Sequence, residues 1–179
     1  MITIADAVAI ELASPEGEAV RVEWDPGALD RDRLHDLSTP TWTLSGEVDW
    51  DEIEALRIVS AAIPDGRAVA LVALRPAGAA GHGDDVVAAA IVADADATEI
   101  DEPLLSVETD ADGMPARIAL ELRFGSETIP LRVAGDVTRS ARDSHAGVEL
   151  VRAELEVRLD GKRSAGTFDV LGADTGAAR

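Results

Sequence analysis

The clearest pattern in the chain is a stretch of strict alternation near its C-terminal end. Apolar side chains take the odd positions of segment 151–159, and charged side chains take the even positions between them. Alternation with period two predicts a β-strand with one face in the core and one in water. Asp160-Gly161 suits a type I′ turn, and segment 164–170 alternates again, so the stretch predicts a β-hairpin. Val148 and Leu150 are apolar in the opposite phase, which predicts a bulge or sharp bend near Leu150.

The same kind of pattern recurs along the chain and predicts about ten to twelve strands. Segments 2–12 and 20–24 predict a first hairpin, with a turn at residues 14–17 between them. Segment 28–37 is short and polar and predicts a loop with a helical turn, and the Gly- and Ala-rich segment 77–85 predicts a flexible loop. The further strands that we expect lie at 41–47, from about 55 to 62, and at 67–75, 86–92, 98–100, 104–109, 116–124 and 128–133.

No segment of helical length separates these strands, which excludes a doubly wound α/β sheet. Segments 67–75 and 86–92 are apolar on both faces. Such strands lie in the middle of a sheet or in the wall of a covered barrel. The sequence therefore predicts an all-β fold, a single antiparallel lipocalin-like β-barrel, with a β-sandwich as the alternative. We expect one domain over residues 1–172 and a disordered tail over 173–179.

The chain is strongly acidic and has no cysteine. Its 179 residues include 35 Asp and Glu against 16 Lys and Arg, a formal net charge of −19. This charge repels phosphate backbones and anionic lipid surfaces, so we expect neither nucleic acid nor a membrane as a partner. No apolar run approaches the roughly 20 residues of a membrane helix. We therefore expect a cytoplasmic protein, and its composition fits either a GC-rich coding bias or a salty cytoplasm.

Few side chains in the sequence suggest catalysis. The histidines His35, His82 and His145 each lie near an acidic residue in sequence, but a catalytic dyad requires hydrogen-bonding distance in space. His82 with Asp84 and Asp85 is a weak pattern for a divalent cation, and no segment completes a calcium loop. The sequence also lacks glycine-rich phosphate loops and the GxSxG elbow of serine hydrolases. We therefore expect no metal and no cofactor, and we assign no catalytic residue.

Large aromatic side chains are scarce, with three tryptophans, two phenylalanines and no tyrosine. A tryptophan at a barrel mouth can lie against an apolar ligand, and core packing is the alternative role. We predict that Trp42 and Trp50 line a ligand cavity or its mouth. Arg75 and His145 are the two polar residues that complete the predicted ligand-binding set.

Several turns and their flanking strands resemble one lipocalin-like half of the carotenoid hydratase (hydroxyneurosporene synthase) and AttH-like superfamily. The matching pieces are Pro64–Val69 leading into Leu71–Pro76, the turn Val107–Gly113 with Pro115 and Arg117, and the hairpin Leu159–Gly166. The resemblance implies a lipocalin-like barrel and enzymes that act on terpenoid or polyketide substrates. Members of that group have two stacked barrels, whereas this chain is long enough for one, and we cannot place a catalytic acid of the family on any of its residues.

Two hypotheses of function follow. In the first, the barrel binds a small apolar, terpenoid- or polyketide-like molecule, with cyclase, isomerase or hydratase activity through an Asp or Glu in an apolar pocket. In the second, the protein is a non-catalytic interaction or scaffold protein that self-associates through its barrel wall or strand edges, as a homodimer for example. The motivation for the second is that no predicted helix covers segments 67–75 and 86–92.

Overall fold

The chain folds into antiparallel β-strands, which confirms the all-β class. The computed structural model describes residues 2–4, 8–13, 19–25, 27–93, 96–123 and 129–174. Within these ranges the only helix is a 3₁₀ turn, η1 (His82–Asp84), so no helix there is long and apolar enough to cross a membrane. The strands are β1 (Ile2–Ile4), β2 (Val8–Ala13), β3 (Ala19–Trp24), β4 (Trp42–Ser45), β5 (Ile53–Ala62), β6 (Ala68–Pro76), β7 (Val86–Ala93), β8 (Asp96–Glu99), β9 (Leu104–Thr109), β10 (Pro115–Leu122), β11 (Leu131–His145), β12 (Val148–Leu159) and β13 (Lys162–Ala173).

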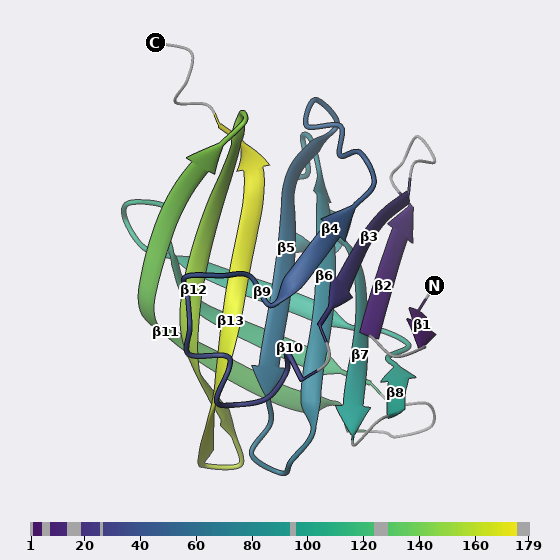
Figure 1. Ribbon diagram of the computed structural model, residues 1–179, viewed down its shortest axis with the longest axis vertical. Coiled ribbons are helices and arrows are strands. Elements are labelled where there is room, and N and C mark those ends of the chain that lie inside the picture. The colour runs from purple at the N-terminus through teal and green to yellow at the C-terminus, as the bar shows by residue number, and fades with distance from the viewer. Residues whose placement is uncertain are drawn as a thin grey trace.

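The strands form two sheets. One has four strands in the order β1-β2-β3-β4, and the other has nine in the order β8-β7-β6-β5-β13-β12-β11-β10-β9. Figure 1 shows β9 and β10 crossing behind β12, β13, β5 and β6, so the nine-stranded sheet folds back over itself. The four-stranded sheet lies on the opposite side of β6 and β7. Among the described residues no backbone pairing joins the end strands β8 and β9, so the ladder does not close into a ring.

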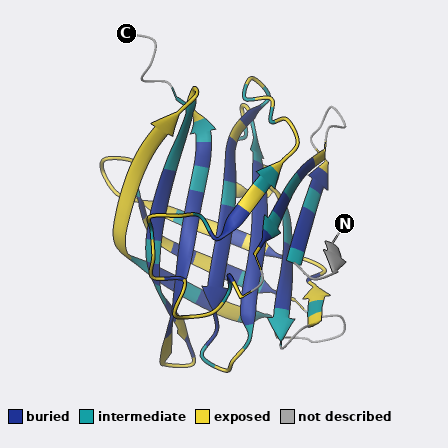
Figure 2. Cartoon of the chain, in the orientation of Figure 1, coloured by how far each residue is buried: buried dark blue, intermediate teal, exposed yellow. Residues whose placement is uncertain are grey.

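The folded sheet encloses one hydrophobic core, and the four-stranded sheet covers a second. The rear core lies between β5, β6, β7, β12 and β13 on one side and β9, β10 and the start of β11 on the other. Its members include Val59, Leu71, Ile91, Leu105, Ile118, Leu120, Leu122, Leu155 and Phe168. The front core lies beneath the four-stranded sheet and includes Ile10, Val22, Trp24, Trp42, Leu56, Ile58, Val72, Leu74 and Leu171. The chain therefore packs strands on both faces of β5 and β6, which Figure 2 shows as mostly buried.

This arrangement explains why β6 is apolar on both faces. Val69, Leu71 and Ala73 belong to the rear core, and Val72 and Leu74 belong to the front core. Consecutive strand residues point to opposite faces. The predicted position in the middle of a sheet is confirmed, and the surface that covers the strand comes from the same chain.

The predicted bulge near Leu150 is wrong. β12 pairs with β13 in continuous register from Val148 to Leu159, and the irregularity lies in the neighbouring strand, between Val137 and Arg139 of β11. The change of apolar phase has another cause. Val148 and Leu150 pack against the front core, whereas the odd positions beyond them face the rear core. The strand stays regular while the face that is covered changes.

The expected strand 128–133 overlaps the beginning of a much longer one, which starts at Leu131, and residue 128 lies outside the described residues. β11 continues to His145, and residues 138–145 are exposed. Because both faces of that part meet solvent, the hydrophobic pattern carries no period there. The short strand predicted at 98–100 forms as β8 (Asp96–Glu99), and β5 begins at Ile53, slightly before the expected position.

Two further boundaries differ from expectation. Segment 2–12 divides into β1 and β2, which pair with each other, and the turn predicted at 14–17 lies outside the described residues. At the other end β13 continues to Ala173, and the backbone N–H of Asp174 donates to the Gly147 carbonyl at 2.9 Å. The rest of the expected tail, 175–179, is also outside the described residues.

Candidate functional site

The segment that connects β3 to β4 lies across one face of β12 and β13, in the middle of the nine-stranded sheet. We call residues 27–41 the cover segment, and Figure 1 shows it passing in front of β12 and β13. Polar contacts hold it there. Arg152 Nη1 donates to the Leu37 carbonyl at 2.9 Å, Arg139 Nη2 donates to the His35 carbonyl at 3.3 Å, and His35 Nδ1 lies 2.9 Å from Glu154 Oε1. The charged face of β12 is thus partly covered by a loop instead of facing water.

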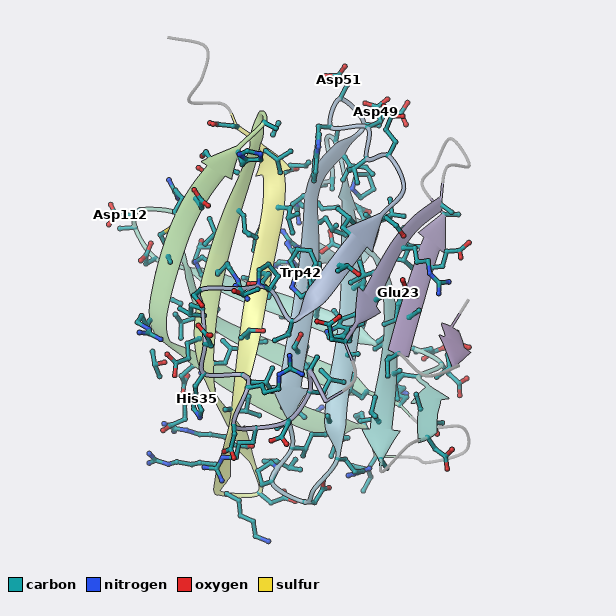
Figure 3. The ribbon with its side chains drawn as sticks, viewed as in Figure 1. Glu23, His35, Trp42, Asp49, Asp51 and Asp112 are labelled. Atoms are coloured by element: carbon teal, nitrogen blue, oxygen red, sulfur yellow. The ribbon has the colours of Figure 1, made fainter. Side chains whose placement is uncertain are left out.

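A buried ion pair lies beneath this segment. Arg152 Nε donates to Asp169 Oδ1 at 3.0 Å, and the Trp42 indole Nε1–H donates to Asp169 Oδ2 at 2.5 Å. Asp169 has no exposed surface, and Arg152 is 5% exposed. Burial raises the pKa of the Asp169 carboxyl, while the Arg152 charge and the Trp42 hydrogen bond act in the opposite direction. Figure 3 shows Trp42 and His35 on the face that the cover segment crosses.

Three polar atoms around this ion pair are buried without a hydrogen-bond partner among the described residues. They are Thr41 Oγ1, Arg152 Nη2 and Thr167 Oγ1. Thr167 lies two residues before Asp169 on the same face of β13, and Thr41 precedes Trp42. A buried polar group without a partner costs free energy. We call Thr41, Trp42, Arg152, Thr167 and Asp169 the polar cluster.

Three apolar side chains anchor the cover segment to the sheets: Ala28 and Leu29 at its start pack in the front core, and Leu34 lies further along. Leu34 is fully buried and forms a small core of its own with Ala62 of β5 and Ala165 of β13. Ser60 of β5 pairs with Thr167 of β13. Ala62 and Ala165 are the next residues on the same face of these two strands. Leu34 therefore lies between the polar cluster and the end of the sheet where β5 and β6 turn.

A groove opens on that end of the sheet, beside Leu34. Its volume is about 450 Å³, and it runs between the cover segment, the β5–β6 turn and the start of β13. Apolar side chains supply part of the lining, and they are Leu29, Ala62, Ile63, Pro64 and Ala68. Arginine side chains, Arg31, Arg67 and Arg163, supply most of the charge. The groove thus combines apolar surface with cationic groups.

The structure does not bring the four predicted ligand-binding residues together. Trp42 is 7% exposed and belongs to the polar cluster. Trp50 is half-buried and lines a separate hollow of about 410 Å³ formed by residues 47–51. Arg75 lies on β6, and His145 is exposed at the end of β11. None of the four lines the groove beside Leu34.

Arg75 takes part in a second buried ion pair, on the rear side of the sheet. The fully buried Asp85 carboxylate lies 2.7 Å from Arg57 Nη1 and 3.4 Å from Arg75 Nη1. Burial lowers the pKa of Arg57, and the Asp85 charge opposes that shift. His82 Nδ1 is 3.8 Å from the same carboxylate. In the described residues no three His, Asp or Glu side chains are placed to hold a metal ion. Through its ion pairs with Arg57 and Arg75, Asp85 anchors the loop that precedes β7.

The sequence analysis missed the Arg152–Asp169 pair, although the hairpin contains a signal for it. The two residues are directly opposite each other when Leu159 pairs with Lys162 across the Asp160-Gly161 turn. Their register follows from the turn. Their burial does not, because the groups that cover them lie more than 100 residues away in the sequence.

Comparison with models of known protein families and with curated proteins gives no match to this chain. The candidate site is therefore interpreted from its own geometry and chemistry.

Proposed function

We propose that this protein binds a small, largely apolar molecule in the groove beside Leu34. The observation that carries the proposal is a groove of about 450 Å³ whose lining includes Leu29, Ile63 and Pro64. Small-molecule sites typically have volumes of about 300 to 1,000 Å³, and the groove falls in this range, with a lining in which polar atoms expose more surface than apolar atoms. Terpenoid- and polyketide-like molecules, the class that the sequence resemblance implies, are the first natural candidates.

We also propose that the nine-stranded sheet is a lipocalin-like barrel that stays open between β8 and β9. The support for this is that a single curved sheet contributes side chains from β7 round to β9 to one continuous rear core. The sandwich alternative has the same strand order and differs only in treating β9, β10 and the start of β11 as a separate layer. The ligand groove lies at one end of this sheet, where hairpin turns and the cover segment meet.

Acid catalysis of a cyclisation, isomerisation or hydration is a second candidate function, and Asp169 favours it. Burial raises the pKa of the Asp169 carboxyl, which is the direction that a general acid requires. Asp169 has no exposed surface, so the reaction requires the cover segment to move. We expect the wild-type protein to turn over such a substrate and Asp169→Asn to bind it without turnover. Equal turnover by the wild-type protein and Asp169→Asn would contradict this role.

Self-association through the strand faces has lost its motivation. It was suggested by two segments that are apolar on both sides, 67–75 and 86–92. The four-stranded sheet packs on one side of these strands and the folded part of the nine-stranded sheet on the other. The chain itself therefore supplies the partner surface for these faces, and self-association through strand edges stays a prediction. Ligand binding is the function that we propose.

The binding proposal can be tested with N-phenyl-1-naphthylamine, a neutral apolar dye that fluoresces when it leaves water. We expect saturable binding to the wild-type protein and competition by a terpenoid or polyketide ligand. Leu29→Trp adds bulk to the groove wall and should weaken binding about tenfold or more, an energy of about 1.4 kcal/mol. Leu104→Trp is the matched control, because Leu104 is 54% exposed on β9.

Circular dichroism should first show that both variants are folded. Binding that is unchanged in Leu29→Trp would place the ligand elsewhere. The lack of any saturable binding to the folded wild-type protein would contradict the proposal as a whole.

A further inference from the structure

The charge of the groove is opposite to that of the chain. The whole sequence has 35 acidic residues against 16 Lys and Arg. The groove lining has three arginines, Arg31, Arg67 and Arg163, and one acidic residue, Asp30. This reversal occurs where the cover segment, the β5–β6 turn and the start of β13 meet, so three distant parts of the sequence each contribute one guanidinium group.

From this reversal, and resting on the proposed function, we infer that the ligand of the groove is a small amphiphilic acid. Its carboxylate, sulfonate or phosphate group contacts the arginines, and its apolar body lies against Leu29, Ile63 and Pro64. Arginine is suited to this task because its planar group presents five N–H donors that match the oxygens of such anions.

Two of the three arginines are oriented by neighbouring carboxylates. Arg67 Nε and Nη2 donate to Asp65 Oδ2 at 2.9 and 2.6 Å. Arg163 Nη1 donates to Glu156 Oε2 at 2.9 Å, and its side chain is 66% exposed. The contact between Arg163 and Glu156 uses one N–H group, so further donors of Arg163 can reach a ligand in the groove. An arginine held in this way loses less conformational freedom when it binds an anion.

Arg31 differs from the other two because it makes no ion pair with any described residue. It is an exposed residue of the cover segment, three positions before the buried Leu34 anchor. The neighbouring Asp30 carboxylate accepts a hydrogen bond from the backbone N–H of Asp32 at 3.0 Å. Asp30 thus has a local partner, whereas Arg31 is the cationic group most readily available to a ligand.

The apolar part of the ligand is needed as well as its charge. A protein with a net charge of −19 repels a free inorganic anion at long range. Surface contacts with exposed arginines are weak and are screened by salt. Burial of an apolar body against the groove wall supplies a contribution that neither effect removes. Inorganic sulfate or phosphate alone should therefore bind poorly.

A pair of dyes tests this inference, because 8-anilinonaphthalene-1-sulfonate contains the ring system of N-phenyl-1-naphthylamine plus one sulfonate. We expect Arg31→Gln and Arg163→Gln each to weaken binding of the anionic dye by at least about threefold. The same variants should change the affinity for the neutral dye by less than about twofold. Added NaCl should weaken binding of the anionic dye and leave binding of the neutral dye unchanged. Sodium sulfate at the same ionic strength should weaken binding of the anionic dye no more than NaCl does.

Arg132→Gln is the control for net charge. Arg132 is a 74% exposed residue of β11 that pairs with Glu121 on the outer surface, at a distance of 3.0 Å, and it does not line the groove. Its loss changes the net charge by the same amount as the loss of Arg31. All variants should first be shown by circular dichroism to have the wild-type fold.

The outcomes separate the inference from the proposed function. If neither dye binds the folded protein, the proposed function is wrong and the inference falls with it. If the neutral dye binds but Arg31→Gln and Arg163→Gln have the wild-type affinity for the anionic dye, only the inference is overturned. If Arg132→Gln weakens binding of the anionic dye as much as the groove variants do, the effect is one of net charge and the inference is also overturned. If inorganic sulfate competes strongly with the anionic dye, the ligand is a simple anion and not an amphiphile, which overturns the inference as well.

Discussion

The Trp42 indole Nε1–H donates to Asp169 Oδ2 at 2.5 Å, although the two residues are 127 positions apart. Trp42 begins β4 at the edge of the four-stranded sheet, and Asp169 lies in β13 at the centre of the nine-stranded sheet. Trp24 makes a similar connection, since its Nε1–H donates to Ser60 Oγ of β5 at 2.8 Å. Two tryptophans thus join the sheets through polar contacts within an otherwise apolar interface.

Replacing Trp42 by phenylalanine removes this donor and keeps an aromatic ring. A hydrogen bond to a charged group contributes about 1.5–3 kcal/mol, so we expect Trp42→Phe to lower the free energy of unfolding by about 2 kcal/mol or more. Urea unfolding followed by circular dichroism measures this. Trp50→Phe is the control: Trp50 is half-buried, and we expect a loss below about 1 kcal/mol. Equal losses would show that the hydrogen bond contributes little.

Removing the charge of Asp169 leaves Arg152 buried without its ionic partner. Breaking one side of a buried ion pair costs about 3–5 kcal/mol, which is the loss of stability expected for Asp169→Asn. Glu121→Gln provides the comparison, because Glu121 pairs with Arg132 on the surface and such pairs contribute about 0–1 kcal/mol. An Asp169→Asn protein as stable as the Glu121→Gln protein would mean that the pair is not buried in solution.

Two aspartates should titrate on opposite sides of their ordinary pKa of 3.8. Burial raises the pKa of Asp169, whereas the hydrogen bond from Arg67 lowers the pKa of Asp65. Carbon-13 NMR of the aspartate carboxyl groups, assigned with Asp169→Asn and Asp65→Asn, measures both directly. We expect Asp65 to ionise below 3.8 and Asp169 above it. A pKa of Asp169 at or below 3.8 would contradict the burial of its carboxyl group.

These shifts have opposite effects on stability. The folded chain holds the Asp169 proton more tightly than the unfolded chain, so this contribution is fully present below pH 3.8 and is lost as pH rises through the folded pKa. The contribution of Asp65 is present above pH 3.8 and is lost as pH falls through its folded pKa. Asp65 is partly exposed, so its contribution is the smaller of the two.

Leu34→Ala should release the cover segment before the rest of the fold. Leu34 is the only residue of this segment in its small core, and Ala28 and Leu29, which pack in the front core, hold only the start of the segment. We expect trypsin to cleave after Arg31 or Arg33 about tenfold faster, because local opening becomes more frequent. The free energy of global unfolding should fall by less than the about 2–5 kcal/mol that is usual for Leu→Ala in a main core.

Leu104→Ala is the control for this experiment, since Leu104 is half-exposed on β9. Cleavage that accelerates only in parallel with global unfolding would show that the segment is part of the cooperative core.

Gly46 and Gly66 form a matched pair for a test of backbone packing. Both have positive φ angles, +97° and +94°, so an alanine at either position is strained by about 1–2 kcal/mol. A Cβ at position 46 would also approach the Ala19 carbonyl oxygen to 2.4 Å, while one at position 66 meets nothing within 4 Å. We expect Gly46→Ala to cost at least about 1 kcal/mol more than Gly66→Ala. Equal costs would contradict the close approach of β3 to residue 46.

Local sequence was sufficient to predict most strands. The Asp160-Gly161 turn predicted the β12–β13 hairpin, and both residues have the positive φ angles that a type I′ turn requires. β11 was predicted only in its first residues because its second half is exposed on both faces. A hydrophobic pattern reports the faces that the fold covers, so a strand without a covered face leaves no period to detect.

Less of the candidate site was predictable. Trp42 was chosen because it is a rare large aromatic residue, and its contact with Asp169 could not be foreseen from local sequence. Leu34 lies in a segment that we expected to be a polar loop, and its burial comes from Ala62 and Ala165. The groove arginines come from three separate segments, so no spacing in the sequence relates them.

The sequence by itself determined the strands, their hairpin register and the acidic surface, because period, turn residues and charge act over a few neighbouring positions. Only the tertiary structure decided which charged side chains are buried. Arg152 and Asp169 occupy the polar phase of their strands, as exposed residues do, and they become an interior ion pair because the cover segment and Trp42 fold over them. Burial depends on the whole path of the chain in space, and this dependence is the physical reason that local pattern could not reveal the site.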